Sequence, residues 1–158
     1  MKIFADQRVS GDGFSGNAAE LDEEYLKFLN TFGVSEHDLQ RWIDRLPFSA
    51  DAKHLLVQIS RMTIQVGFTV ITIGRKIIEI AIRLVKKFPY ATAGLAIGAL
   101  IGSLAGGIPI FGFLLEPIIM PLAMALGLAR GAWQDVQNAS LKSAIREEVA
   151  KFDKLKTA

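Results

Sequence analysis

A single carboxylate, Glu116, lies within a stretch of 42 residues, 88–129, that has no other charged side chain. In "LLEPIIMP" it is followed by Pro117 and Pro121, which remove backbone donors and bend a helix. Ionisable groups inside a bilayer are costly and commonly functional, so Glu116 is a candidate functional residue. Together with the carbonyls freed by the prolines, its carboxylate could line a water-filled path. The alternative is that Glu116 lies close to the turn at Pro109 and meets water there.

A second set of polar side chains recurs at three- and four-residue spacing over residues 52–87, which predicts one polar line along a single long helix. The members assigned to an aqueous lumen are Gln58, Arg61, Gln65, Thr69 and Thr72. On the opposite face, small residues recur every seven positions and predict a seam against a partner helix. These are Ser60, Gly67, Gly74 and Ala81. The alternative is that this β-branched, Thr-rich sequence simply tolerates glycine.

The residue types needed for most enzyme chemistry are missing. There is no cysteine, which excludes disulfides, thiolate metal sites and a cysteine nucleophile. The phosphate-binding loop G-x-x-x-x-G-K-[ST], the G-x-S-x-G elbow and the zinc motif H-E-x-x-H are absent. His37 and His54 are the two histidines, too few for an ordinary zinc site. We therefore expect no enzymatic activity, no metal and no cofactor.

Glycine returns every fourth residue at Gly94, Gly98, Gly102 and Gly106. Each costs about 1 kcal/mol relative to alanine in a water-exposed helix, so four in line need a reason. Inside a bilayer, small residues at this spacing let two helices pack closely. A shorter stripe follows at Ala123, Gly127 and Gly131. We expect these stripes to join subunits of a homo-oligomer; the alternative is that they seat the two helices of one hairpin.

Charge divides the chain into four segments that must position these residues. Residues 1–50 carry 5 basic and 9 acidic side chains and residues 51–87 carry 7 and 2. Residues 88–129 hold Glu116 alone, and residues 130–158 carry 6 basic and 4 acidic side chains. The predicted units are a flexible arm with an acidic two-helix unit (1–50), a long basic amphipathic helix (51–87), a transmembrane or re-entrant hairpin (88–131) and a C-terminal amphipathic helix (132–158).

Within the first segment, residues 1–18 are rich in Gly, Ser, Asp and Asn and predict a loop or arm. "LDEEYLKFLNTFG" predicts a helix that stops at Gly33, and "SEHDLQRWIDRLP" predicts a second helix capped by Ser35 and ended by Pro47. These short acidic helices could recruit a cytosolic protein partner.

The uncharged segment has the pattern of a helical hairpin broken at residues 106–109, with halves of about 24 Å and about 30 Å against a hydrocarbon core of about 30 Å. Basic residues flank it and are expected to meet anionic lipid headgroups rather than nucleic acid. They are Arg75, Lys76, Arg83, Lys86, Lys87 and Arg130. We expect the protein in the cytoplasmic (inner) membrane, and the positive-inside rule predicts that both termini face the cytoplasm.

The sequence thus predicts an all-α membrane protein in contact with lipid, and a homo-oligomer that forms a pore or permeabilises the membrane. The first alternative is a non-enzymatic membrane anchor or scaffold that recruits a cytosolic partner through its N-terminal helices. A third hypothesis, a bundle that covers the hairpin until triggered, is disfavoured because the amphipathic helices look too few to bury 42 apolar positions.

Overall fold

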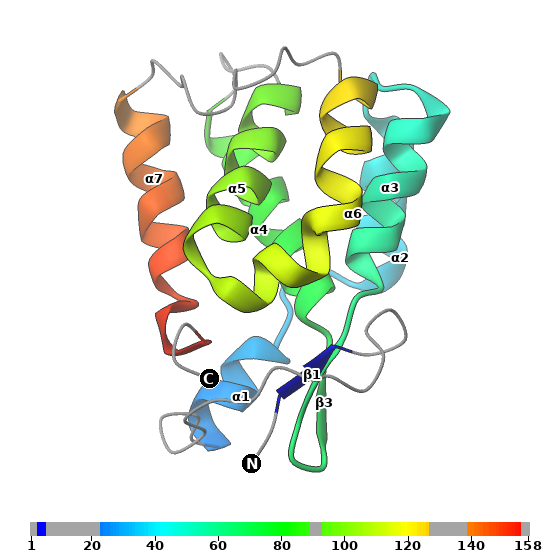
Figure 1. The fold of residues 1–158 in the computed structure, drawn as a ribbon. Helices are drawn as coiled ribbons and strands as arrows, with labels where there is room; N and C mark the ends of the chain where they lie inside the picture. The colour runs from blue at the N-terminus through cyan, green and yellow to red at the C-terminus, as the bar shows by residue number, and fades with distance from the viewer. Residues whose placement is uncertain (1–2, 6–22, 89–92, 127–138, 156–158) are drawn as a thin grey trace.

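The computed structural model describes residues 3–5, 23–88, 93–126 and 139–155. Over these ranges the chain is mostly helical, as predicted, with one small antiparallel sheet (Figure 1). The helices are α1 (Glu23–Leu29), α2 (Glu36–Arg45), α3 (Ala50–Ser60), α4 (Ile73–Lys87), α5 (Ala93–Gly107), α6 (Pro109–Ala125) and α7 (Ala139–Ala150). The strands are β1 (Ile3–Ala5), β2 (Ile64–Val66) and β3 (Thr69–Ile71), and a 3₁₀ turn, Asp153–Leu155, follows α7.

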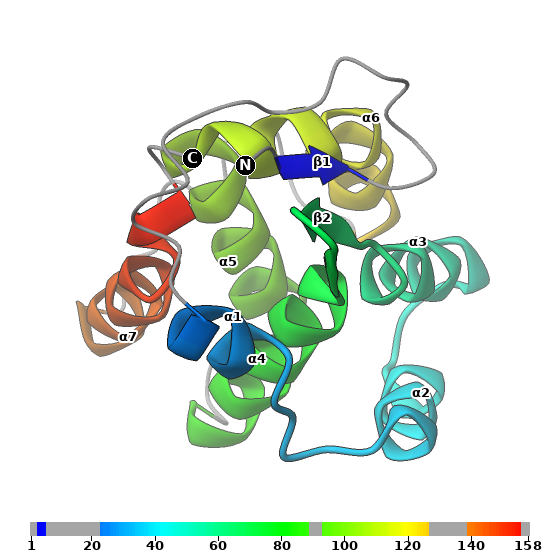
Figure 2. The same ribbon diagram turned by 90° about the horizontal axis from the view of Figure 1, so that it is seen from below.

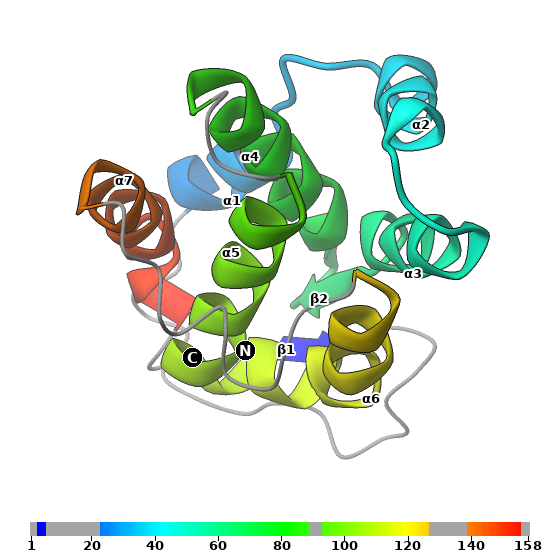
Figure 3. The same ribbon diagram turned by 90° about the horizontal axis from the view of Figure 1, so that it is seen from above.

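Helices α4 and α5 form the centre of the bundle. Helix α5 packs against α4, α6 and α7, while α4 packs against α2, α3, α5 and α7. The views along the helices show α5 surrounded by these neighbours, with α2 and α7 on opposite sides (Figures 2 and 3). One continuous hydrophobic cluster draws on all of these helices and on both strands of the β2–β3 hairpin.

The single long helix expected over residues 52–87 is wrong. Helix α3 ends at Ser60, β2 and β3 form a hairpin, and α4 begins at Ile73. The reason lies in the β-branched residues around Gly67, which favour strands, and in Gly67 itself, whose φ of 62° suits a two-residue hairpin turn. Ile64 and Val66 point into the core and Gln65 points out, so the local period is two.

The predicted polar line therefore does not form one surface. Gln58 lies half-buried on α3, and Arg61 caps the end of that helix. Gln65 and Thr69 are exposed on β2 and β3, whereas Thr72 is half-buried before α4. The five residues are divided between the end of α3, the β2–β3 hairpin and the residue before α4, and they differ in exposure, so they do not form one continuous polar face of a helix.

The predicted seven-residue seam is divided in the same way. Ser60 ends α3, Gly67 lies in the hairpin turn, and Gly74 and Ala81 are buried on α4. Gly74 still has a packing role, because a Cβ built there would overlap the carbonyl oxygen of Ile59 in α3. The glycine is required by contact between α3 and α4 of one chain.

Part of the predicted N-terminal arm is a strand. Ile3–Ala5 pair with β2 in antiparallel register, Phe4 opposite Gln65, so the sheet has the order β1-β2-β3. Pairing with β2 satisfies backbone groups that an edge strand would otherwise leave open.

The break in the apolar segment is confirmed. Helix α5 ends at Gly107 and α6 starts at Pro109, with Ile108 fully buried between them. Gly112 allows the two helices to approach, since a Cβ there would lie 2.8 Å from the Ala105 carbonyl oxygen. Helix α6 continues through Pro117 and Pro121. Helices α5 and α6 have 15 and 17 residues, and neither they nor any other helix in the described ranges is long and apolar enough to cross a membrane.

Replacing Gly74 with alanine tests the contact between α3 and α4. We expect Gly74→Ala to lower the free energy of unfolding by about 3 kcal/mol, because the added methyl group must displace backbone and not a flexible side chain. Urea unfolding followed by circular dichroism measures the change. Gly106→Ala is the matched control: nothing lies within 4 Å of its Cβ position, so stability should stay the same or rise by up to about 1 kcal/mol.

Candidate functional site

The apolar hairpin α5–α6 is covered in part by the other helices. Eight residues of α5 and seven of α6 are buried. The covering helices are α3, α4 and α7, and Phe152 beyond α7 packs edge-on against Phe111 of α6, with ring centroids 5.2 Å apart. Helix α5 packs against α4, α6 and α7, and eight of its fifteen residues are buried, so the bundle covers more of this helix than was expected from the sequence.

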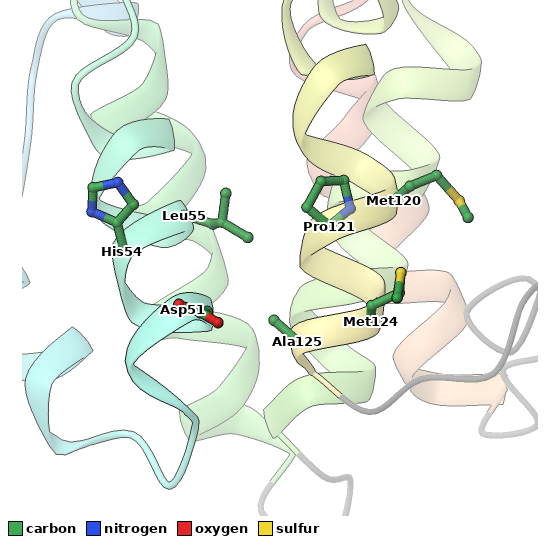
Figure 4. A pocket seen from close by; sticks show the side chains of 7 residues that line it. All are labelled: Asp51, His54, Leu55, Met120, Pro121, Met124 and Ala125. Carbon is green, nitrogen blue, oxygen red and sulfur yellow. The ribbon is translucent and has the colours of Figure 1, made fainter.

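Helix α6 has an exposed apolar face. Phe113, Met120 and Met124 are 47%, 53% and 75% exposed. Met120 and Met124 also border a groove of about 630 Å³ between α6 and α3 (Figure 4). Leu55 of α3 points across this groove toward α6, and Asp51 and His54 add polar groups on the α3 side.

Glu116 is exposed on α6, which agrees with the alternative that it meets water. It borders an open groove of about 380 Å³ between α5 and α6. Gly102, Gly106 and Gly112 border the same groove, so small residues and one carboxylate face outward together.

The glycine stripe of α5 is half internal and half open. Gly94 and Gly98 are buried, and a Cβ on Gly94 would lie 3.6 Å from the Phe48 ring. Gly102 is half-buried and Gly106 exposed, with nothing within 4 Å of its Cβ position. Ala123 is buried on α6, whereas Gly127 and Gly131 lie outside the described residues. Contact between subunits through the open end stays a prediction.

The basic residues expected at lipid headgroups divide into internal and external groups. Lys76 is 4% exposed and Arg75 is half-buried, so neither presents a free charge on the surface. Arg83 pairs with Glu148 of α7 at 3.1 Å. Lys86 and Lys87 are exposed near the end of α4, and Arg130 lies outside the described residues.

The internal basic residues belong to a network that we call the polar clasp. It joins the segment after α1 to the start of α4 through Asn30, Thr31, Gly33, Val34, Thr72, Arg75, Lys76 and Glu79. The Lys76 ammonium donates to the Thr31 carbonyl oxygen at 2.8 Å and lies 3.9 Å from the Glu79 carboxylate. The second carboxylate oxygen of Glu79 accepts the Gly33 N–H at 3.0 Å.

The rest of the clasp fixes the segment on both sides of this ion pair. The Asn30 side chain accepts the Thr72 N–H at 2.9 Å and donates to the Val70 carbonyl at the same distance. The Arg75 guanidinium donates to the Val34 carbonyl at 2.8 Å and lies 4.2 Å from the centre of the Phe32 ring. Its buried Nε has no partner within the described residues.

Burial lowers the pKa of Lys76, and the negative charge of Glu79 opposes this shift. Among the smaller contributions, Arg83 and Lys151 lower the pKa and Glu148 raises it. In the sequence, Lys76 and Glu79 are three residues apart, a spacing at which side chains on a helix meet, and Glu79 is the one acidic residue of α4. That spacing was available in the sequence, but Lys76 was instead expected at lipid headgroups. Their role here is positioning, because they hold α1 and its following segment against α4.

Comparison with models of known protein families, with curated proteins and with solved structures finds no match to this chain. Within the described ranges, no three His, Asp or Glu side chains gather where they could hold a metal ion.

Neutralising Glu79 tests how much the Lys76–Glu79 ion pair contributes to the free energy of unfolding. In Glu79→Gln the buried Lys76 loses its counter-ion, and we expect the free energy of unfolding to fall by about 3 kcal/mol. Adding Lys76→Met should restore part of the loss, since the unpaired buried charge is then gone. Urea unfolding measures all three proteins. Glu148→Gln, which affects two more exposed ion pairs, with Arg83 and with Lys151, should cost less than about 1 kcal/mol. An equal loss there would contradict the clasp.

Tyr25 of α1 forms a hydrogen bond with the segment that follows α7, and this bond predicts that the stability of the fold depends on pH. Its hydroxyl donates to the Lys151 carbonyl at 2.6 Å, and burial, with a contribution from Asp153, raises the pKa of Tyr25 above its ordinary value of 10.0. A raised folded-state pKa means that this stabilisation is complete below pH 10.0 and is lost as the pH rises beyond it.

Tyr25→Phe should lower stability by about 1 kcal/mol at neutral pH and flatten the alkaline decline. Urea unfolding over a pH series compares the two proteins. The pKa of Lys76 is lowered, so Lys76 makes both proteins more stable as the pH rises. The difference in unfolding free energy between the two proteins therefore reports on Tyr25 alone. Parallel alkaline declines would show that another group is responsible.

Proposed function

We propose that this chain is a homo-oligomeric protein of the cytoplasmic membrane, that it permeabilises the bilayer, and that α5–α6 is the part that enters lipid. The observation that carries the proposal is the chemistry of the hairpin: Glu116 is its single ionisable group over residues 93–125. The tip between α5 and α6, from Gly106 to Pro109, is uncharged. An uncharged leading end can enter hydrocarbon without carrying an ion with it.

Exchange of protein neighbours for lipid is energetically plausible for α5 and α6. Their buried side chains are apolar, and lipid tails are about as apolar as leucine, so moving these surfaces from the bundle into lipid costs little hydrophobic energy. Helix α4 differs, because Lys76 and Glu79 would each cost about 3 kcal/mol at the centre of a bilayer. The clasp therefore favours retention of α4 with α1 while the hairpin separates from both.

The lengths of α5 and α6 favour permeabilisation of the bilayer over a role as a membrane anchor alone. At 1.5 Å per residue, α5 and α6 measure about 22 Å and about 26 Å, less than the hydrocarbon core of about 30 Å. Short apolar segments are accommodated by thinning of the bilayer or by oligomerisation. The open end of the glycine stripe, Gly102 and Gly106, offers close packing between copies.

A charge on the exposed face of α6 tests the proposal. Met120 is 53% exposed, so Met120→Lys should leave the fold and its melting temperature unchanged. In lipid the lysine is unfavourable by about 3 kcal/mol, and release of an entrapped dye from vesicles should fall at least about tenfold. Ala150→Lys adds the same charge at an exposed site of α7 and should release dye like the unaltered protein.

Mass photometry in detergent and membrane fractionation separate the alternatives. Oligomers with dye release support the proposal. Membrane-bound protein that releases no dye and stays monomeric would instead support an anchor that recruits a partner through α1 and α2, and would overturn permeabilisation.

A further inference from the structure

A cleft of about 400 Å³ lies between α2 and α4. Helix α2 is on the side of the bundle opposite α7 (Figures 2 and 3). Arg41, Trp42 and Arg45 line it from α2, and Ile82 and Lys86 line it from α4. Gly33 and Val34, which the polar clasp holds in place, also line it.

Three positive charges meet at this cleft. Arg41 and Arg45 are four apart on α2 and therefore share a face, and Lys86 comes from the last turn of α4. All three are exposed, and none takes part in an ion pair within the ranges that the structure describes. Asp38 is the acidic residue among the lining side chains, so the cleft has a net positive charge.

The size and surroundings of the cleft select a small anion. Arginine presents paired N–H donors that match the oxygens of a phosphate. Glu36 and Asp44 also lie on α2 but do not line the cleft, so the positive charge is local and suits a single phosphate group.

Trp42 indicates that the phosphate belongs to a lipid. It is half-buried and packs against the core beside the two arginines. Tryptophan next to basic residues is typical of the membrane–water interface, where the indole meets the apolar boundary and the cations meet headgroups.

We propose that the α2–α4 cleft binds the phosphate of an anionic lipid headgroup, and that the side chains of Arg41, Arg45 and Lys86 donate hydrogen bonds to that phosphate. This inference rests on the proposed action at a membrane and specifies the lipid that the protein prefers. It also gives α2 a role that the net negative charge of residues 1–50 conceals.

Vesicle flotation with a matched pair of variants tests the cleft. Arg45→Gln with Lys86→Gln removes one arginine and one lysine from it, and Lys142→Gln with Arg146→Gln removes the same two types from the exposed face of α7. On mixed phosphatidylcholine–phosphatidylglycerol vesicles, the first pair should weaken binding roughly 30-fold, equivalent to about 1 kcal/mol for each basic group. The α7 pair should weaken it less than about threefold, and binding to pure phosphatidylcholine should be the same for all proteins.

Fluorescence of Trp42 gives a readout at the site itself. The chain has two tryptophans, so Trp133→Phe leaves Trp42 as the single emitter. Phosphatidylglycerol vesicles should shift its emission to shorter wavelength in the unaltered cleft and in the α7 pair, but not in the Arg45 and Lys86 pair.

Several results would overturn the inference. Equal losses in the two variant pairs would mean general charge attraction. Binding of soluble glycerol phosphate at least as tight as binding of phosphatidylglycerol vesicles would point to a free phosphate ligand, and tighter binding of a labelled oligonucleotide than of vesicles would point to nucleic acid. Dye release separates this inference from the proposed function: a cleft that binds lipid in a protein that releases no dye would leave the inference standing and overturn permeabilisation.

Discussion

Burial of α4 on nearly every side is the constraint on which the rest of the structure depends. The helix packs against α2, α3, α5 and α7, and ten of its fifteen residues are buried. Close approach to α3 requires glycine at Gly74, and burial of Lys76 and Glu79 requires that both charges find partners. The segment after α1 supplies those partners from its backbone, so placement of the N-terminal helices follows from the polar demands of α4.

The same helix separates two kinds of surface. On one side of α4 lies the apolar hairpin, whose side chains need an apolar environment but not a particular partner. On the other side lie the clasp and the α2–α4 cleft, where fixed hydrogen bonds and charges set the geometry. Apolar contacts are non-directional and can be exchanged for lipid, whereas the clasp loses specific bonds if it opens. This difference is the physical basis for assigning membrane entry to the hairpin and recognition to the α2–α4 side.

Local signals in the sequence predicted several elements well. Ser35 accepts the Asp38 N–H as the expected cap of α2, and Gly107 and Pro109 bound the two apolar helices. The long helix failed because polar spacing over residues 52–87 fits a helix even where β-branched residues and Gly67 form a hairpin. Arg75 and Lys76 were placed at the surface for a related reason: periodicity identifies a polar stripe but does not say whether solvent or the protein's own backbone satisfies it.

The sequence by itself determined the predominance of helices, the apolar hairpin whose one ionisable group is Glu116, and the absence of cysteine chemistry. Composition and short-range spacing govern these properties. Tertiary structure decided that α4 and α5 lie at the centre, that Glu79 meets the Gly33 N–H 46 positions away, and that Arg41 and Arg45 meet Lys86 at one cleft. Such pairings join residues far apart in the chain, and they depend on how several helices share one core, which no local pattern encodes.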